Sequence, residues 1–179
     1  MSMNRRTMSA LRRCLLPVAC ALLLVGCGFH LQGSHHLPAG IDSMYVAYHS
    51  NYRATIPPVV KALRQRLRTG HQLGDASAKA RLVVKRIKNS RHIVSISPID
   101  GRAAEYELRS EVTFDYIVDG KALVNNQHFT VTRYYSYNDA ARLAEDAERR
   151  DLTARMQQQL ADRILFRIQQ VNTQGQKTS

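Results

Sequence analysis

Hydrophobic and polar residues alternate most regularly between residues 103 and 118. Every second side chain there is apolar or small, and the positions between them are mostly charged or polar. Because a period of two places each set on its own face of a strand, this stretch predicts a long β-strand with one buried face. Asp119-Gly120 follows directly and predicts a tight hairpin turn, since both residues tolerate positive φ. The apolar positions from Leu123 to Tyr137 then predict an antiparallel return strand.

Two earlier stretches also have the composition of strands. Residues 43–49 form a short run with apolar, aromatic and β-branched side chains, which predicts a buried strand. Residues 80–97 are rich in valine and isoleucine, and their polar positions are mostly basic. The segment from Pro98 to Gly101 predicts a turn between this second strand and the alternating one.

Helical periodicity characterises the two remaining regions. Pro57 and Pro58 stand where the first turn of a helix tolerates proline, and apolar residues recur on one side until Gly70. After Ser136 and Asn138, either of which can cap a helix, apolar residues recur at near-fourfold spacing up to residue 171. Both regions therefore predict amphipathic helices.

The expected order β-α-β-β-β-α is typical of an α+β two-layer sandwich, with two helices packed on one face of a four-stranded mixed sheet. The first helix suits a parallel crossover between the first two strands, whereas the hairpin makes the last two strands antiparallel. We expect a single domain over residues 41–171, followed by a disordered polar tail over residues 172–179.

The N-terminal segment has the pattern of a bacterial lipoprotein signal. Four arginines precede an apolar run over residues 15–25, which is too short to span a bilayer but suits a cleaved export signal. Residues 24–27 have the form of a lipobox that ends in Gly26-Cys27. We therefore predict a signal peptide over residues 1–26, N-acyl and S-diacylglycerol lipids on Cys27, and a tether over residues 27–40. Gly28 in place of aspartate favours the outer membrane.

Removal of this signal leaves 153 residues, enough for one compact domain. All three cysteines lie at or before Cys27, so the mature domain has neither a disulfide nor a thiol for catalysis or zinc. The signal contains four of the 26 basic residues and none of the 14 acidic ones, so the net charge falls from +12 to +8. Export argues against nucleic acid and favours anionic phospholipid, phosphorylated glycolipid or an acidic protein as partner. A generally basic proteome is the alternative explanation.

No catalytic constellation stands out in the sequence. It lacks a phosphate-binding glycine loop, a nucleophile elbow and a His-Glu-x-x-His motif. Glu105, Glu107 and Glu111 share the wet face of the alternating strand with an arginine, where ion pairing or solvation explains them. His35-His36 has no neighbouring carboxylate or thiol, so we expect no metal site and no cofactor beyond the lipid. These observations predict a non-enzymatic protein.

Over nearly its whole mature length, the chain resembles the LPS-assembly lipoprotein family LptE. The resemblance is carried by Cys27-Gly28-Phe29-His30-Leu31, Leu37-Pro38, Ala104-Glu105-Tyr106-Glu107-Leu108, Arg133-Tyr134-Tyr135 and the expected order of elements. It implies lipopolysaccharide binding and a place at the outer membrane as the plug of the β-barrel LptD. In that role the protein would template folding of the barrel and assist lipopolysaccharide transport to the cell surface.

The resemblance and the chemistry of the side chains together suggest candidate residues for binding lipopolysaccharide and for contacting the barrel. Arginine forks suit the phosphates of lipopolysaccharide, and basic residues are expected to gather at the end of the sheet near Pro98. The lipopolysaccharide-binding candidates are Arg91, His92, Arg102 and Arg142. Where family members have basic residues near this turn and in the final helix, the chain has Ile99 and Glu145. The barrel-contact candidates are Tyr134, Tyr135 and Tyr137, because tyrosine is enriched at interfaces.

Two other functional classes remain as alternatives. An anchored periplasmic lipid-binding or transport accessory without a barrel partner would need a closed lipid cavity, for which a two-layer sheet of this size has little room. A periplasmic hydrolase would need convergent titratable groups, which the sequence does not display. At the N-terminus, an ordinary secretory signal or an uncleaved anchor are the alternatives to a lipoprotein signal.

Overall fold

The structure is a computed structural model that describes residues 37, 40–48, 55–136 and 142–176, with side chains of the last segment described over 145–171. Its elements are β1 (Met44–Tyr48), α2 (Pro58–Thr69), β2 (Ala80–Ile96), β3 (Ala103–Val118), β4 (Lys121–Ser136) and α3 (Arg142–Gln176). This confirms the expected order β-α-β-β-β-α. The predicted signal peptide, the lipidation site Cys27, most of the tether and Tyr137 lie outside the described residues.

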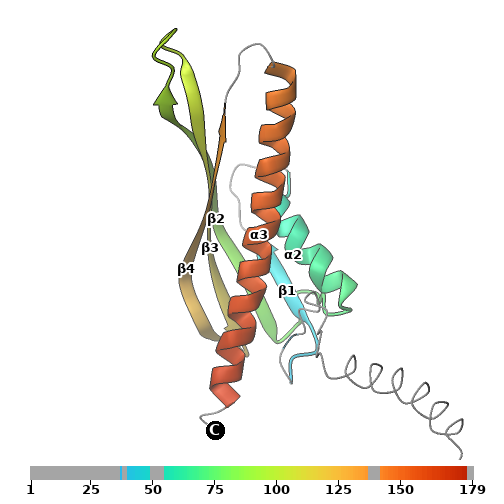
Figure 1. Cartoon of the computed structure of the whole chain (residues 1–179). Coiled ribbons are helices and arrows are strands. Elements are labelled where there is room, and N and C mark those ends of the chain that lie inside the picture. Colours follow the sequence, from blue (N-terminus) through green and yellow to red (C-terminus); the bar gives the residue numbers. More distant parts are fainter. Residues whose placement is uncertain (1–36, 38–39, 49–54, 137–141, 177–179) are drawn as a thin grey trace, which may run out of the picture. The chain divides into compact units, whose positions relative to one another are not determined.

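The strands form one mixed sheet in the order β1-β2-β3-β4. The short β1 runs parallel to β2 and pairs with it from Met44 opposite Ala80 to Tyr48 opposite Val84. A parallel pair needs a crossover connection, which α2 supplies. β3 is antiparallel to both β2 and β4. The β2–β3 hairpin therefore extends well beyond the end of β1, as Figure 1 shows.

Both helices cover the same face of the sheet, α2 over β1 and α3 over β3 and β4 (Figure 1). Alternate side chains of β3, including Leu108, Val112, Phe114 and Tyr116, are buried beneath α3. The buried stripes of the helices complete the same core, with Val59, Val60, Leu63 and Leu67 from α2 and Met156, Leu160, Ala161, Ile164, Leu165 and Ile168 from α3. The predicted two-layer α+β fold is thus confirmed.

The hairpin between β3 and β4 has the predicted turn. Asp119 and Gly120 have φ values of 48° and 78°, as a two-residue turn that matches the twist of its strands requires. Farther along β4, Asn126 also has a positive φ, and its N–H donates to Asp115 Oδ1 at 2.7 Å beside a register shift. The sequence pattern predicted the turn but not this bulge.

The helix α3 is longer at its C-terminal end than expected. It continues to Gln176, which corrects both the helix end predicted at residue 171 and the disordered tail predicted to begin at residue 172. The apolar stripe ends near residue 171, but a helix that is already formed adds backbone hydrogen bonds through polar residues without further burial. Residues 177–179 lie outside the described part.

Candidate functional site

Arg91 lies on the face of β2 that α3 covers, against a pair of stacked tyrosines. Its guanidinium carbon is 4.5 Å from the centroid of the Tyr106 ring, and its Nη1 donates to the Tyr135 hydroxyl at 3.5 Å. The two rings stack with centroids 5.5 Å apart and planes at 20°. Because Tyr106 and Tyr135 are direct cross-strand partners, the register of β3 and β4 fixes the ring pair that holds the arginine.

A pocket of about 470 Å³ opens beside Arg91, between the sheet and the N-terminal part of α3. Its lining consists of Asn89, Ser90, Arg91, Leu108, Arg109, Ser110, Asp146, Arg149 and Thr153. Below it, Ser110 Oγ and Gln157 Nε2 each donate to Asn89 Oδ1 at 2.8 Å. Ser110 and Gln157 are both buried, so this end of the core is polar rather than aliphatic.

Positive charge is in excess around the pocket. Arg149 Nη2 donates to Asp146 Oδ1 at 3.0 Å, and this hydrogen bond, with the charges of Arg149, Arg150 and Arg91, lowers the pKa of Asp146. Among the described residues no carboxylate forms an ion pair with Arg91. Its guanidinium is therefore oriented by aromatic contacts while its charge stays available to an anion, such as a phosphate that accepts two parallel hydrogen bonds.

The other basic candidates do not join Arg91 in a cluster. His92 follows Arg91 in the strand and lies on the opposite face, where its Nε2 is 3.2 Å from Ser90 Oγ. Arg102 lies at the exposed hairpin tip, with its Nε 4.0 Å from Asp100 Oδ2. Arg142 begins α3, and its side chain lies outside the described ones. The expected gathering of Arg91, His92 and Arg102 is corrected, because alternation in β2 separates the first two.

The two described tyrosine candidates also lie on opposite faces. Tyr135 is 5% exposed and belongs to the core, whereas Tyr134 is 57% exposed on the face turned away from the helices. The Tyr134 hydroxyl donates to Glu107 Oε2 at 3.1 Å, and this hydrogen bond raises the pKa of Tyr134. Of these two residues, Tyr134 is the one placed to contact a partner.

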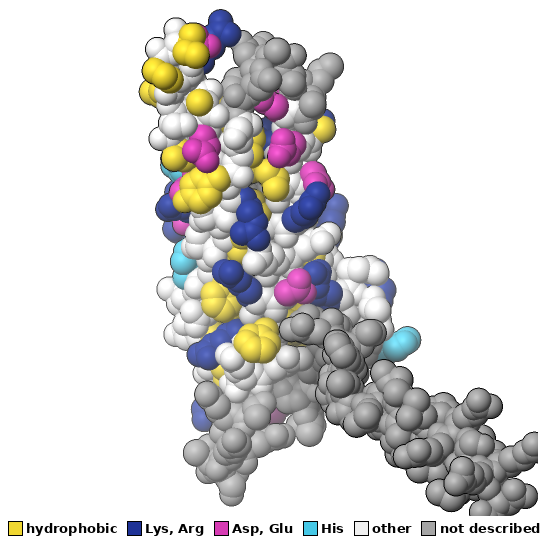
Figure 2. All heavy atoms as spheres, viewed as in Figure 1, with side chains coloured by type: hydrophobic (Ala, Val, Ile, Leu, Met, Phe, Trp, Pro, Cys, Tyr) yellow, Lys and Arg dark blue, Asp and Glu magenta, His cyan; other side chains and the backbone are white. Residues whose placement is uncertain are grey.

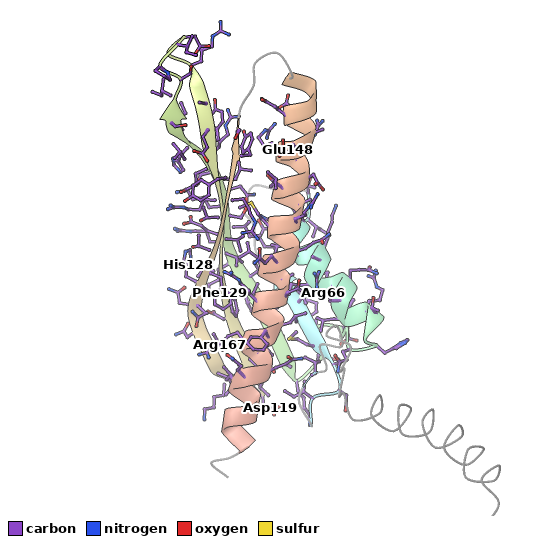
Figure 3. The ribbon with its side chains drawn as sticks, in the orientation of Figure 1. Arg66, Asp119, His128, Phe129, Glu148 and Arg167 are labelled. Atoms are coloured by element: carbon purple, nitrogen blue, oxygen red, sulfur yellow. The ribbon has the colours of Figure 1, made fainter. Side chains whose placement is uncertain are left out.

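The open face of the sheet is polar and contains several ion pairs. Arg109 Nη2 is 2.9 Å from Glu107 Oε1, and Lys85 Nζ is 2.6 Å from Asp115 Oδ2. His128 points away from α3 (Figure 3), with its Nε2 3.9 Å from a Glu111 oxygen. Glu107 is thus ion-paired with Arg109, as expected for a carboxylate on the exposed face of this strand. No group of His, Cys, Asp or Glu residues within the described part could hold a metal ion.

Sequence reasoning missed three contributors to the pocket, namely Tyr106, Asn89 and Arg149. In the sequence Tyr106 stands out only within the motif that carries the family resemblance, and its place opposite Tyr135 depends on register. Asn89 and Arg149 come from elements that meet only after α3 packs across the sheet. No local sequence signal distinguishes Arg149 from the other exposed arginines of its helix.

Comparison with known proteins places the chain in a family. The family model described as "LptE: Lipopolysaccharide-assembly" matches residues 41–168. The LPS-assembly lipoprotein LptE of Photorhabdus laumondii is 32% identical over 161 residues, covering 87% of this chain and 85% of that protein. The protein of the same name from Pectobacterium atrosepticum is 28% identical over 155 residues, covering 84% and 81%.

Solved structures have the same fold. The crystal structure of the rare lipoprotein B from Shewanella oneidensis matches with a TM-score of 0.64 and 25% identity, covering 75% of this chain and 98% of that one. The solution structure of a lipoprotein B from Nitrosomonas europaea matches with a TM-score of 0.66 and 23% identity, covering 84% and 96%. The matched family model spans β1, the whole sheet and α3 up to its last buried turn, so the chain belongs to the LptE family of lipopolysaccharide-assembly lipoproteins.

Proposed function

We propose that this protein is a non-enzymatic lipoprotein of the outer membrane that binds lipopolysaccharide and works with the β-barrel LptD. In this proposal lipid chains on Cys27 anchor it on the periplasmic side. The domain fills the barrel as its plug, assists its folding, and hands lipopolysaccharide to the outer leaflet. Membership in the LptE family supports this assignment. No helix in the described part of the chain is both long and apolar enough to cross a membrane.

Arg91 is the observation that best supports lipopolysaccharide binding. The Tyr106 ring and the Tyr135 hydroxyl hold its guanidinium at the edge of the 470 Å³ pocket, and no described carboxylate forms a direct ion pair with it. A phosphorylated sugar presents a phosphate for such a fork and hydroxyl groups for a polar lining. The polar side chains of Asn89, Ser110 and Thr153 contribute to that lining.

The open face of the sheet supports a barrel partner. It carries ion pairs and hydroxyl groups, which suit the polar interior of a wide barrel. Tyr134 stands on this face with more than half of its side-chain surface exposed. An amphipathic ring of this kind adds contact area to an otherwise polar interface.

Substitution of Arg91 tests the ligand site. We expect Arg91→Ala to weaken binding of purified lipopolysaccharide by about tenfold or more, since a hydrogen bond to a charged group contributes roughly 1.5–3 kcal/mol. Arg155→Ala is the matched control, because it removes an arginine charge from α3 where Asp151 already pairs with it. Equal binding by the two variants, with both folded, would remove Arg91 from the site.

The barrel partnership is tested separately. The tagged, lipidated protein is purified from detergent-solubilised outer membranes, and its bound proteins are identified by mass spectrometry. Stoichiometric recovery of a β-barrel protein of LptD size is the expected result. If the folded lipoprotein is recovered alone and still binds lipopolysaccharide, it is instead a lipid-binding accessory that acts without a barrel.

A further inference from the structure

The edge of β2 beyond Val84 is open in the described structure. β1 pairs with β2 only from Ala80 to Val84, so the edge of β2 from Lys85 to Ile96 has no neighbouring strand among the described residues. This free β2 edge belongs to the long hairpin that extends past β1 in Figure 1. It exposes a row of backbone donors and acceptors of the kind that a further strand can pair with.

Arginines cap the other two edges of the sheet. On β1, the Val46 carbonyl accepts a hydrogen bond from Arg64 Nη2 at 2.9 Å. On β4, the Thr130 carbonyl accepts one from Arg163 Nη1 at 2.9 Å, and the Thr132 carbonyl accepts one from Arg133 Nη1 at 3.0 Å. No comparable cap reaches residues 85–96 from any described side chain. Within the part of the chain that the structure describes, the outer edges are thus protected and the β2 edge beyond Val84 is available.

The register identifies which backbone groups of β2 point outward. The carbonyls of Thr130 and Thr132 face away from β3, so each residue forms a non-hydrogen-bonded pair with its partner on β3, Glu111 or Arg109. In such a pair both residues point their backbone groups away from each other, so Glu111 and Arg109 point theirs toward β2. On β2 the residues paired with Glu111 and Arg109 are Lys88 and Ser90, whose backbone groups point back toward β3. The intervening residues Asn89, Arg91 and Ile93 therefore turn their N–H and C=O groups to the free edge.

Charge and hydrophobicity along this edge define what can bind there. β2 contains no acidic residue, and its basic side chains from Lys85 onward are Lys85, Arg86, Lys88, Arg91 and His92. Of these, Lys85 has an ion pair with Asp115, and no described carboxylate pairs with the other four. Two such edges repel each other, so a second copy of this chain is a poor partner, whereas an acidic strand is a good one.

The far end of the same edge is apolar. Ile93, Val94 and Ile96 are 57%, 50% and 61% exposed, and Ile99 at the tip is 94% exposed. Figure 2 shows hydrophobic side chains gathered at this tip. An uncapped edge strand with exposed aliphatic side chains is an aggregation hazard unless a partner covers it.

From these observations we infer that the free β2 edge pairs with an extended segment of the barrel protein, which adds to the sheet as a fifth strand. The segment is acidic where it passes residues 85–92 and apolar where it reaches residues 93–96. The inference rests on the proposed barrel partnership and names the contact through which it forms. Main-chain pairing would supply affinity, and the alternating side chains would supply specificity.

Photo-crosslinking in cells tests the contact with the full lipidated chain. A photoreactive residue replaces Lys88, Ser90 or His92 on β2, and, as a control, Thr132 on β4. We expect β2 crosslinks to fall within one contiguous acidic segment of the barrel protein. Each two-residue step along β2 should move the crosslinked position by about two residues, as strand pairing requires. Scattered β2 crosslinks, β2 crosslinks to a second copy, or crosslinks from β4 alone would overturn the inference while leaving the partnership intact.

A proline scan gives an independent test. Ile93→Pro removes an outward N–H that no described group uses, so the sheet keeps its own hydrogen bonds. We expect co-purification of the barrel to fall about tenfold, with lipopolysaccharide binding by the isolated protein retained. Ile93→Val controls for the side chain, and Thr132→Pro controls for proline on the capped edge of β4. Unchanged recovery with Ile93→Pro would contradict strand addition, and loss of barrel from every variant and the parent would refute the partnership itself.

Discussion

At the scale of single residues, the position of Arg91 depends on two contacts of unequal strength. Its hydrogen bond to the Tyr135 hydroxyl is long, at 3.5 Å, whereas its guanidinium carbon lies 4.5 Å from the Tyr106 centroid, well within cation–π range. The aromatic contact therefore holds the arginine more firmly than the hydrogen bond does. Tyr135 contributes mainly by stacking on Tyr106 and filling the core.

This ranking predicts the order of two variants. Tyr106→Leu should reduce lipopolysaccharide binding by about twofold to thirtyfold, because a cation–π contact contributes roughly 0.5–2 kcal/mol. Tyr135→Phe keeps the stacked ring and should reduce binding by less than about threefold. Binding titrations of both folded variants give the comparison. A larger loss with Tyr135→Phe would assign the main role to the hydroxyl instead.

At the scale of elements, the turn between β3 and β4 sets the register of the site. Gly120 has a φ of 78°, and the space where a Cβ would stand is empty, so substitution costs backbone strain rather than a clash. Gly120→Ala should lower the free energy of unfolding by about 1 kcal/mol. Gly70→Ala is the comparison, because Gly70 has a φ of −82° that alanine adopts readily, and the nearest atom to its new Cβ is the side-chain oxygen of Gln72 at 3.3 Å. Urea unfolding of both variants measures the difference, and equal stabilities would contradict the assigned turn.

The helix α3 stabilises the fold through one face only. Leu160 is fully buried against the sheet, whereas Phe166 is 57% exposed on the same helix. Leu160→Ala should lower the free energy of unfolding by about 2–5 kcal/mol, and Phe166→Ala by less than about 1 kcal/mol. Thermal or denaturant unfolding checks both values. A large loss with Phe166→Ala would place that ring in a contact outside the described core.

Between the two helices, Arg66 of α2 joins Asp162 of α3 through two hydrogen bonds of 2.5 and 2.9 Å. Both side chains are partly exposed, so this bidentate pair orients the helices more than it stabilises them. Burial of the apolar stripes on α2 and α3 provides the main attraction between helices and sheet.

At the scale of the whole molecule, acid should destabilise the fold through several exposed aspartates. Hydrogen bonds from Ser77, Ser97 and Arg149 lower the pKa values of Asp75, Asp100 and Asp146, respectively, below the ordinary value of 3.8. A carboxyl with a lowered folded-state pKa stabilises the protein above its unfolded pKa, and this stabilisation is lost as the pH falls through the folded value.

We therefore expect the urea midpoint to be nearly constant from about pH 7 to about pH 5 and to fall below about pH 4. Replacement of the three aspartates by asparagine should make the acid part of this profile shallower. Because all three groups are exposed, the difference should be modest. An unchanged acid profile in the triple variant would assign acid sensitivity to the general gain of positive charge.

Much of the architecture was predictable because local patterns encode it. The strict alternation of β3 identified its buried face, Asp119-Gly120 identified the hairpin, and near-fourfold spacing identified α3. In each case the side-chain period follows from backbone geometry and does not depend on distant parts of the chain. The same kind of local pattern predicted the lipobox at Cys27, which lies outside the described residues.

The sequence by itself thus determined the elements, their order, the faces they bury and the absence of a cysteine after Cys27. Tertiary structure alone decided that Arg91 joins Tyr106, Tyr135 and a pocket beside Arg149. It also decided that β1 pairs with β2 only up to Tyr48, so that one edge of β2 beyond Val84 has no neighbouring strand among the described residues. Register, bulges and strand coverage depend on which distant segments pack together, and periodicity within one segment has no information about that choice.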